Sequence, residues 1–356
     1  MPYIRCRYDG RAWPVAHEYG LLMAKGTDYI ATWFYKENAD EASYYPQMGG
    51  GSARYVHLIY MQILVPFFTT FRRYNPRAGL LFFSNPDEGA LPGYLVDTLR
   101  RNEVEQVTVP YTCRPPKGWY KAWMNQYYLY DILRAMEKRM RPCDTLLVCD
   151  ADCICSKPLD ELFDSVRRDG SALYDCHYPD DLVVNGTTRK QMAEVYKGCF
   201  GEEKHFSYYG GEFIALRGDA VARINRVFPV LAKYNFALPE GGGARLHEEA
   251  HFLSVLAARL DLCNDTANKY VKRMYTSSVY NNVEAGDEQL AVWHVLSEKK
   301  TGLYRLYRLI RRNQGMGDEA AFWKKAGEWC GIPHTSLKKR VLDVVYRQIV
   351  KRGWNK

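Results

Sequence analysis

Two aspartates separated by one small residue follow an apolar run near the middle of the chain. The run covers residues 144–149 and leads directly into Asp150, Ala151 and Asp152. Carboxylates at positions i and i+2 offer hard oxygen ligands to Mn²⁺ or Mg²⁺ and leave positions open for phosphate oxygens. Such an ion would stabilise the charge that builds on a diphosphate leaving group. A pair of turn or helix-capping aspartates is the alternative, because short Asp-x-Asp matches also arise by chance.

A second acidic group lies in the run His247-Glu248-Glu249-Ala250-His251. Two acids in the first turn of a helix suit the positive end of its dipole, which would be a purely structural reason for them. The two histidines, four residues apart, would share one helix face and make zinc an alternative, although no third ligand is apparent. In the functional interpretation Glu249 lies near the anomeric carbon of a sugar and Glu248 accepts hydrogen bonds from its hydroxyls.

The His247–His251 run is preceded in the chain by Tyr208-Tyr209-Gly210-Gly211-Glu212-Phe213. Together the two runs resemble the paired motifs of the retaining family 6 glycosyltransferases of GT-A fold, which include the blood-group A and B transferases. The resemblance covers about residues 147–260. It implies an acceptor pocket bordered by Tyr209, Gly210, Gly211 and Glu212, with Glu248 as the donor-binding acid and Glu249 as the nucleophile. Glu248 replaces an aspartate and Ala250 a serine, so the resemblance leaves the donor sugar open.

A third motif is His294-Val295-Leu296-Ser297-Glu298-Lys299-Lys300. It resembles the C-terminal His-x-x-Gly-x-x-Lys motif of glycogenin-like galactosyltransferases, with Ser297 in place of the glycine. The resemblance implies that His294 is the third metal ligand and that Lys300 or Lys299 contacts the diphosphate. The chemistry agrees, because a neutral imidazole binds Mn²⁺ and an ammonium group stabilises phosphate. A surface histidine beside a helix start is the alternative.

Strands and helices alternate along the first half of the chain, which predicts right-handed βαβ units and a mostly parallel sheet. The expected strands are 28–37, 79–83, 106–109, 144–149, 171–174, 212–216 and 290–296. The expected helices are 53–74, 91–102, 120–140, 158–168, 219–234, 248–260 and the chain from residue 303 onward. The fold class is therefore α/β, with helices flanking the sheet, and the resemblance to the family 6 enzymes implies the Rossmann-like GT-A kind. Ligands bind beyond the carboxyl ends of such strands, where Asp150 and Asp152 would lie. Tyr35 and Lys36 would end the first strand, where a nucleotide base or ribose is expected.

Composition and length favour a globular chain with a full core. The 356 residues are 47% hydrophobic and 25% charged, which is ordinary for a folded domain. We expect a GT-A nucleotide-sugar-binding domain over residues 1–300 and a basic helical tail over residues 301–356. The cysteines show no paired spacing and are expected to be reduced and buried. The first residues lack the apolar core of a signal peptide, so a cytoplasmic location is expected.

The basic surplus is concentrated at the C-terminus. Residues 299–356 contain 15 Lys and Arg against 4 Asp and Glu. In the expected helix 337–352, Leu337, Val341, Val345 and Ile349 form one apolar stripe with basic residues around it. This pattern suits a peripheral helix on the anionic inner face of a membrane. A helix packed on the main domain with a solvated basic face fits equally well. No nucleic-acid-binding motif accompanies the charge, so no nucleic-acid partner is expected.

The combined hypothesis is a metal-dependent, retaining glycosyltransferase. It would move a hexose from a nucleotide diphosphate, of the uridine type, to a hydroxyl of a glycan or lipid-linked acceptor. Inversion stays an alternative, because a single well-placed acid could act as a base. A sugar-1-phosphate nucleotidyltransferase is a rival, but it needs a glycine-rich basic loop after the first strand, where residues 37–40 read Glu-Asn-Ala-Asp. A non-catalytic membrane-associated binding protein is the other rival.

Overall fold

A six-stranded sheet forms the centre of the computed structural model, which describes residues 26–37, 53–86, 88–120, 122, 125–239, 243–277 and 280–352. Its strands are β1 (Asp28–Phe34), β2 (Gly79–Ser84), β3 (Val104–Thr108), β4 (Thr145–Cys149), β6 (Ser171–Asp175) and β7 (Tyr209–Arg217), in the order β3-β2-β1-β4-β7-β6. Strands β1 to β4 are parallel, and β7 runs antiparallel to both β4 and β6. The prediction of an α/β fold with a mostly parallel sheet is confirmed.

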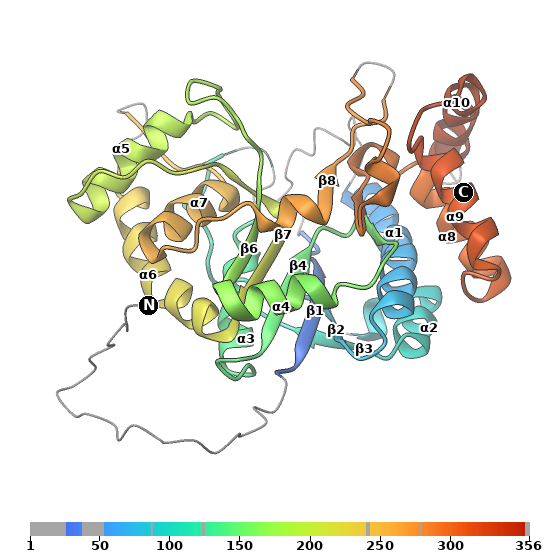
Figure 1. The fold of residues 1–356 in the computed structure, drawn as a ribbon, viewed down its shortest axis with the longest axis horizontal. Helices are drawn as coiled ribbons and strands as arrows, with labels where there is room; N and C mark the ends of the chain where they lie inside the picture. Colours follow the sequence, from blue (N-terminus) through green and yellow to red (C-terminus); the bar gives the residue numbers. More distant parts are fainter. Residues whose placement is uncertain are drawn as a thin grey trace.

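Helices cover both faces of this sheet (Figure 1). One face carries α1 (Ala53–Tyr74), α2 (Gly93–Arg101) and α4 (Asp160–Asp169), and further out α8 (Gly302–Asn313) packs on α1 and α9 (Glu319–Cys330) packs on α8. The other carries α3 (Tyr128–Glu137), α5 (Arg189–Phe200), α6 (Gly218–Phe236) and α7 (Glu249–Leu260). Strand β2 shows why the strands are continuously apolar: Leu80 and Phe82 enter one core, while Leu81 and Phe83 enter the other.

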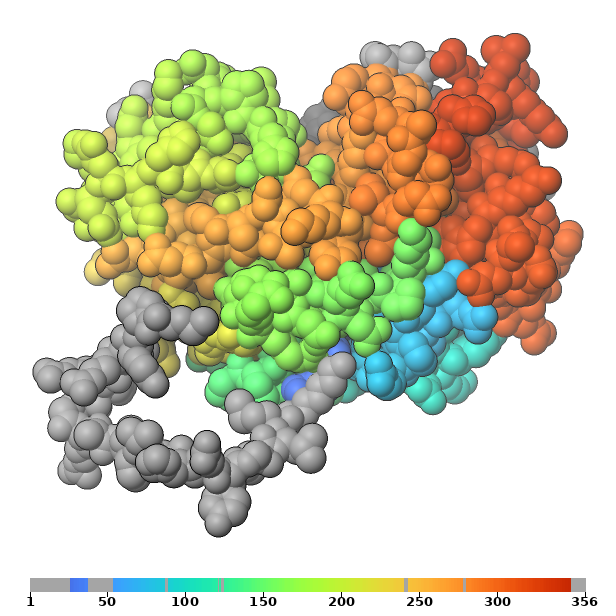
Figure 2. Space-filling model, viewed as in Figure 1, coloured from blue at the N-terminus to red at the C-terminus, as the bar shows by residue number. Residues whose placement is uncertain are grey.

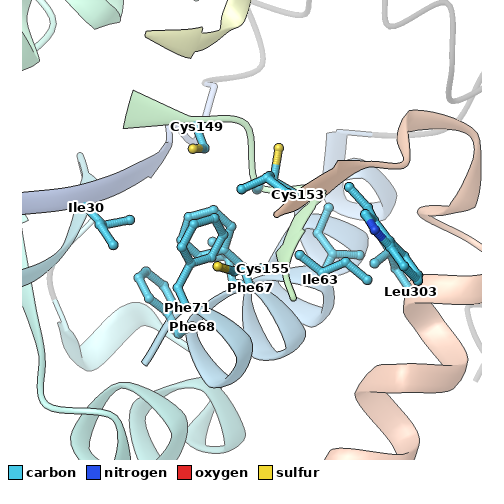
Figure 3. Close-up of a cluster of buried hydrophobic side chains, with 14 of the residues drawn as sticks. Ile30, Ile63, Phe67, Phe68, Phe71, Cys149, Cys153, Cys155 and Leu303 are labelled. Carbon is cyan, nitrogen blue, oxygen red and sulfur yellow. The ribbon is translucent and has the colours of Figure 1, made fainter. Parts of the chain in front are cut away.

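Helix α1, which matches the helix predicted over residues 53–74, is a buried core helix. Its Phe67, Phe68 and Phe71 are fully buried and lie close to Ile30 and Cys155 (Figure 3). Within the described ranges, no helix is long and apolar enough to cross a membrane. All cysteines in these ranges are free, and those of the cluster at residues 149, 153 and 155 are buried, but Cys143 and Cys263 are exposed, contrary to the expectation of buried thiols.

A second, three-stranded sheet adjoins the first. It consists of β5 (Cys153–Cys155), β8 (Val271–Arg273) and β9 (Val292–His294), in the order β5-β9-β8. Strand β9 corresponds to the strand predicted over 290–296, but it is shorter and is followed by a 3₁₀ turn, Leu296–Glu298. Strands β5 and β8 escaped prediction because three residues are too few to show a period-2 pattern.

Several helix boundaries differ from those expected. The helix predicted over 120–140 is confined to α3, and residues 121, 123 and 124 lie outside the described ranges. The helical region from 303 onward is three helices, because Gln314 and Gly331 end α8 and α9 in left-handed conformations before α10 (Leu337–Arg352). Helix α5 was missed, although Thr188 and Gln191 form a capping box at its start.

Candidate active site

Three side chains converge beyond the carboxyl end of β4. Asp150 follows β4, and its backbone N–H donates to the carbonyl of Glu212 on β7 at 3.0 Å. Asp152 precedes β5, and its carbonyl accepts from the N–H of Val295 at 3.1 Å. His294 ends β9. One ligand atom from each of Asp150, Asp152 and His294 lies within 4.8 Å of the others, so strand pairing brings together the three predicted metal ligands.

The chemistry of this cluster fits a divalent ion. The Nε2 atom of His294 lies 3.3 Å from Oδ1 of Asp152 and 3.7 Å from Oδ2 of Asp150. His294 is buried, and neither of its ring nitrogens has a hydrogen-bond partner among the residues the structure describes. Two carboxylates and an imidazole form a mixed oxygen and nitrogen set that suits Mn²⁺ and also admits Mg²⁺.

Lys299 supplies a positive charge to the cluster. Its buried ammonium group donates to Oδ2 of Asp152. Burial would raise the pKa of Asp152, but Lys299 and His294 outweigh it and hold that pKa well below its usual value. The side chain of Asp150 is 45% exposed and open to the cavity on one side. Desolvation by the surrounding protein, followed by the charge of Asp152, raises the pKa of Asp150 to about 6. Burial alone would lower the pKa of His294, whereas the nearby Asp152 raises it.

The cluster faces a cavity of about 310 Å³. Nine of the residues nominated from the sequence line it, namely Tyr35, Asp150, Asp152, Gly211, Glu212, Glu248, Glu249, His294 and Lys299. Tyr209, Gly210, Lys36 and Lys300 do not appear in its lining. Of the two candidate lysines it is therefore Lys299, rather than Lys300, that reaches the cavity.

The residues that end β1 lie at the edge of this cavity. Tyr35 is buried, and its hydroxyl accepts from the guanidinium of Arg114 at 2.6 Å. Lys36 lines a neighbouring cavity of about 350 Å³ that shares Phe34 and Tyr35 with the first. The peptide groups of Lys36 exchange hydrogen bonds with the side chain of Asn85, at 2.6 Å and 2.9 Å. This pairing fixes the backbone where β1 meets the two cavities.

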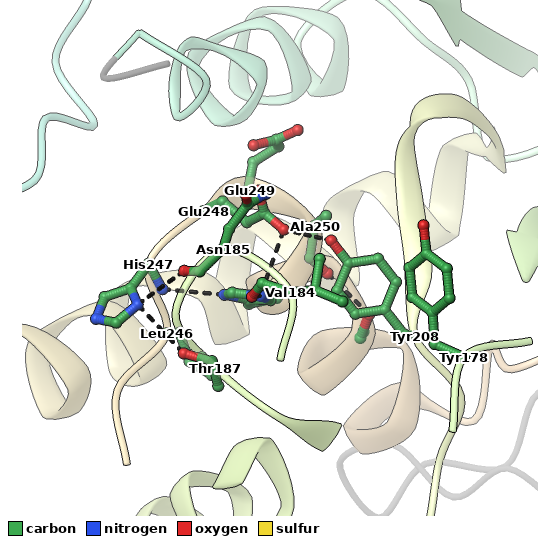
Figure 4. A network of polar contacts seen from close by, with 12 residues as sticks. Tyr178, Val184, Asn185, Thr187, Tyr208, Leu246, His247, Glu248, Glu249 and Ala250 are labelled. Carbon is green, nitrogen blue, oxygen red and sulfur yellow. Dashed lines mark hydrogen bonds and ion pairs between the residues drawn. The ribbon is translucent and has the colours of Figure 1, made fainter. Parts of the chain in front are cut away.

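Glu248 is held in a polar network at the start of α7 (Figure 4). Its carboxylate accepts from the hydroxyl of Tyr208 and from the side-chain amide of Asn185. Nε2 of the buried His251 lies 3.3 Å from its Oε1. Glu248 is the N-cap residue, so the two acids of the run fall at the positive end of the helix, as expected from the dipole.

The zinc alternative for this run does not hold. The letters His247-Glu248-Glu249-Ala250-His251 fit the His-Glu-x-x-His pattern, but that pattern needs both histidines on one helix face. His247 precedes the N-cap and donates its backbone N–H to Nδ1 of His251 at 3.1 Å. Within the described ranges the Asp150 cluster is the only group of residues arranged to hold a metal ion.

Glu249 begins α7, and its carboxyl group lines the cavity. Its Oε2 has no hydrogen-bond partner in the described part of the chain. Burial, followed by the charges of Glu248 and Asp150, raises the pKa of Glu249 well above its usual value. A β-carbon on Gly211 would collide with the Glu249 carboxyl, and one on Gly210 would collide with that of Glu212. Because these two glycines lack a β-carbon, the carboxyl groups of Glu249 and Glu212 can lie close to the backbone of β7.

Arg273 on β8 is a cavity residue that the sequence did not reveal. Its guanidinium makes a two-pronged ion pair with Glu212, at 2.5 Å and 2.7 Å, and donates to the hydroxyl of Tyr178 at 2.8 Å. Burial would raise the pKa of Glu212, but Arg273 outweighs it and lowers that pKa. Nothing in a three-residue strand marks such a residue. Asn185 was missed as well, although the Asn185-Gly186 pair is a turn signal.

Comparison with known proteins adds a likeness to solved glycosyltransferases. No protein-family model and no curated protein matches the chain. The galactosyltransferase LgtC, in complex with donor and acceptor sugar analogs, is 12% identical with a TM-score of 0.46, over 88% of this chain and 99% of that chain. An active-site mutant of LgtC is 11% identical with a TM-score of 0.45, over the same shares of the two chains. Mouse xyloside xylosyltransferase 1, in its apo form, is 11% identical with a TM-score of 0.44, over 75% of this chain and 97% of that chain. Likeness at this level leaves the activity to be argued from the site itself.

Proposed function

We propose that the chain is a metal-dependent glycosyltransferase that moves a hexose from a nucleotide diphosphate sugar, of the uridine type, to a hydroxyl of a glycan or lipid-linked acceptor. One observation carries the proposal: the Asp150, Asp152 and His294 cluster faces the same cavity as Glu248 and Glu249. A metal-dependent glycosyltransferase needs both side chains that bind a cation and carboxyl groups that contact the donor sugar. A cavity of about 310 Å³ falls within the usual range of small-molecule sites, about 300–1,000 Å³.

Asp150, Asp152 and His294 would hold Mn²⁺ or Mg²⁺. When bound, the ion would offset the charge on the diphosphate leaving group and favour the ionised form of the nearby Glu249. Lys299 would add a second positive charge for the phosphates, because its ammonium group already lies in the cavity against Asp152. Tyr35 and Lys36 would contact the nucleotide, since the cavity that Lys36 lines shares Tyr35 with the first.

Glu248 would orient the donor sugar. Tyr208 and Asn185 donate to its carboxylate and leave it further acceptor capacity toward sugar hydroxyls. These two contacts come from different segments of the chain and fix the carboxylate in one position. A fixed acceptor selects among sugars by the direction of their hydroxyl groups.

Glu249 would act at the anomeric carbon. Its carboxyl group faces the cavity with an oxygen that makes no hydrogen bond to the described residues, so that oxygen is available to a ligand. In its ionised form Glu249 would stabilise or attack the oxocarbenium-like centre, with retention of configuration. The acceptor would lie along Gly211 and Glu212, which line the cavity beside Arg273.

A screen of nucleotide sugars tests the proposal. With Mn²⁺ or Mg²⁺ present, the full chain should hydrolyse one uridine diphosphate hexose or transfer its hexose to an acceptor. A chelator should stop the reaction. The same incubation with a nucleoside triphosphate and a sugar-1-phosphate serves as the control for the nucleotidyltransferase alternative. Turnover that survives the chelator, pyrophosphate release in the control reaction, or donor binding without turnover would each contradict the proposal.

A further inference from the structure

Helix α10 exposes apolar side chains to solvent along one face. Leu337 is 77% exposed, Val341 61%, Val344 60% and Val345 47%. Their spacing of i, i+4, i+7 and i+8 places them on one side of the helix. Monomeric proteins seldom leave such a contiguous apolar face uncovered, and faces of this kind usually mark an interaction site.

The opposite side of α10 is polar and buried. Lys339 makes ion pairs with Glu298 at 2.8 Å and with Asp343 at 2.6 Å. Asp343 also pairs with Arg305 of α8 at 2.9 Å, and that guanidinium lies 4.2 Å from the ring centroid of Tyr346. Turning the helix over would leave these charges buried without partners, which is strongly destabilising. The ion pairs therefore fix α10 with its apolar face outward.

This orientation contradicts one of the two sequence interpretations of the helix, and it agrees with the other, in which the apolar stripe faces outward toward a membrane. A helix packed on the main domain was expected to bury its apolar stripe and solvate its basic face. Instead α10 packs on the domain through Lys339 and Asp343, and Leu337 and Val341 stay outside. The helix is thus attached to the protein and still offers an apolar face to a partner.

Charge indicates which partner fits this face. Lys338 and Arg340 are exposed beside the apolar residues, and residues 299–356 contain 15 Lys and Arg against 4 Asp and Glu. If a second copy of the chain bound this face, the basic residues around the face in the two copies would lie close together and repel each other. An anionic lipid surface would complement it, and helices with an apolar face and a basic rim lie in the membrane interface.

We propose that α10 is a membrane-docking helix, whose face of Leu337, Val341, Val344 and Val345 enters the headgroup region of an anionic bilayer while Lys338 and Arg340 contact the lipid headgroups. The partner is the bilayer surface itself. Docking of this kind is reversible, because a single amphipathic face binds more weakly than a spanning helix.

Helix α10 and a hollow beside the candidate site lie on the same side of the molecule (Figure 1 and Figure 2). Figure 2 shows a hollow between the light-green segment that contains α5 and the orange segment that contains β8, and α10 lies on the same upper side of the molecule in Figure 1. Tyr178 and Tyr275, from these two segments, line the cavity. If the proposed function holds, a lipid-linked acceptor at the bilayer surface would lie near that hollow. Docking itself does not depend on the activity.

Sedimentation of the full chain with vesicles tests the docking. The chain should bind vesicles that contain phosphatidylglycerol and should bind pure phosphatidylcholine vesicles much less. The double variant Val341→Asp, Val344→Asp should lose about tenfold or more of this binding, because charges replace the inserted apolar groups. Val230→Asp is the matched control, since Val230 is 55% exposed on α6, and it should bind as the original chain does.

Three outcomes would overturn the proposal. They are failure of the original chain to bind anionic vesicles, equal binding by the double variant, and equal loss by the Val230→Asp control. A dimer in solution that the double variant dissociates would instead assign the face to a second copy. The readout is lipid binding alone, so a failed donor screen and a failed docking test can be told apart. Circular dichroism checks that the variants fold, as expected for substitutions at exposed positions.

Discussion

Lys339 of α10 and Glu298 in the turn after β9 form a buried ion pair of 2.8 Å. Glu298 also accepts from the hydroxyl of Thr301 at 2.5 Å and from the N–H of Gly302 at 3.0 Å. The next residue is Lys299, whose ammonium group contacts Asp152. Through this ion pair, helix α10 stabilises the turn that carries Lys299, the lysine that lines the cavity.

Replacement of Lys339 tests this support. Lys339→Met should lower the free energy of unfolding by about 3–5 kcal/mol, because it leaves the buried Glu298 carboxylate without its charged partner. Urea denaturation measures the change. Lys338→Met on the exposed side of the same helix is the control and should stay within about 0.5 kcal/mol. Adding Glu298→Gln to Lys339→Met should recover part of the lost free energy of unfolding. If the losses from the two single substitutions simply added in the double variant, the ion pair would contribute no stability.

Asp152→Asn should remove metal binding while the fold is retained. The carboxylate is a ligand candidate and the strongest acid of the cluster, so its loss should weaken Mn²⁺ binding at least about 100-fold. Titration calorimetry of the full chain with Mn²⁺ gives this readout without any donor sugar. Asp97→Asn, at an exposed position on α2, should bind Mn²⁺ as the original chain does. Equal affinity in both variants would refute the assigned ligand set.

Gly211→Ala should impair catalysis without unfolding the protein. The added methyl group would displace the Glu249 carboxyl from its position beside β7, and a small misplacement of a catalytic group costs about 100-fold in rate. Measured kcat should fall with little change in thermal stability. Gly93→Ala is the matched control, because a β-carbon at Gly93 has open space around it. Full activity of Gly211→Ala would mean that Glu249 has no role that depends on its position.

Glu249→Gln and Glu248→Gln should fail in different ways. The first keeps the shape and removes the ionisable carboxyl, so kcat should fall about 1,000-fold or more while donor affinity stays close to normal. The second weakens the acceptor of sugar hydrogen bonds and should mainly raise KM. Proton NMR of the first-formed product from the original chain should show retained configuration. An inverted anomer would exclude the nucleophile role of Glu249.

Glu249 should also make stability depend on pH. Its folded-state pKa is raised by burial and by Glu248, so the folded protein holds a proton that the unfolded chain releases above pH about 4.5. The stability this proton contributes is complete below that value and is lost as pH rises toward the raised pKa. With chelator present, the original chain should therefore lose more stability than Glu249→Gln between pH 5 and pH 8, as measured by urea denaturation. Parallel curves for the two proteins would contradict the raised pKa.

The sequence predicted the part of the site that stands on regular structure. Strand β4 is apolar on both faces, which made it recognisable and placed Asp150 at its carboxyl end. The Gly210-Gly211 pair and the acids Glu248 and Glu249 were recognisable as motifs because adjacent residues carry the chemistry. His294 was found in the same way, by its spacing to the lysines that follow it.

The remaining half of the site depends on contacts between distant segments. Arg273 meets Glu212 across 61 positions of sequence, and Asn185 meets Glu248 across 63. Neither pair leaves a local pattern. Helix α10 shows a related difficulty: periodicity predicted its apolar stripe, but periodicity does not say which face turns inward. Buried ion pairs at Lys339 decided it.

The shortest connection between the two sheets runs from β4 to β5 through Asp150-Ala151-Asp152, and two of these three residues are ligand candidates. The third candidate, His294, belongs to the smaller sheet. A bound ion would therefore cross-link two separately hydrogen-bonded sheets at this short connection, and its binding free energy would add to the stability of the folded chain. Removal of the ion would therefore take away this stabilisation together with the proposed catalytic activity.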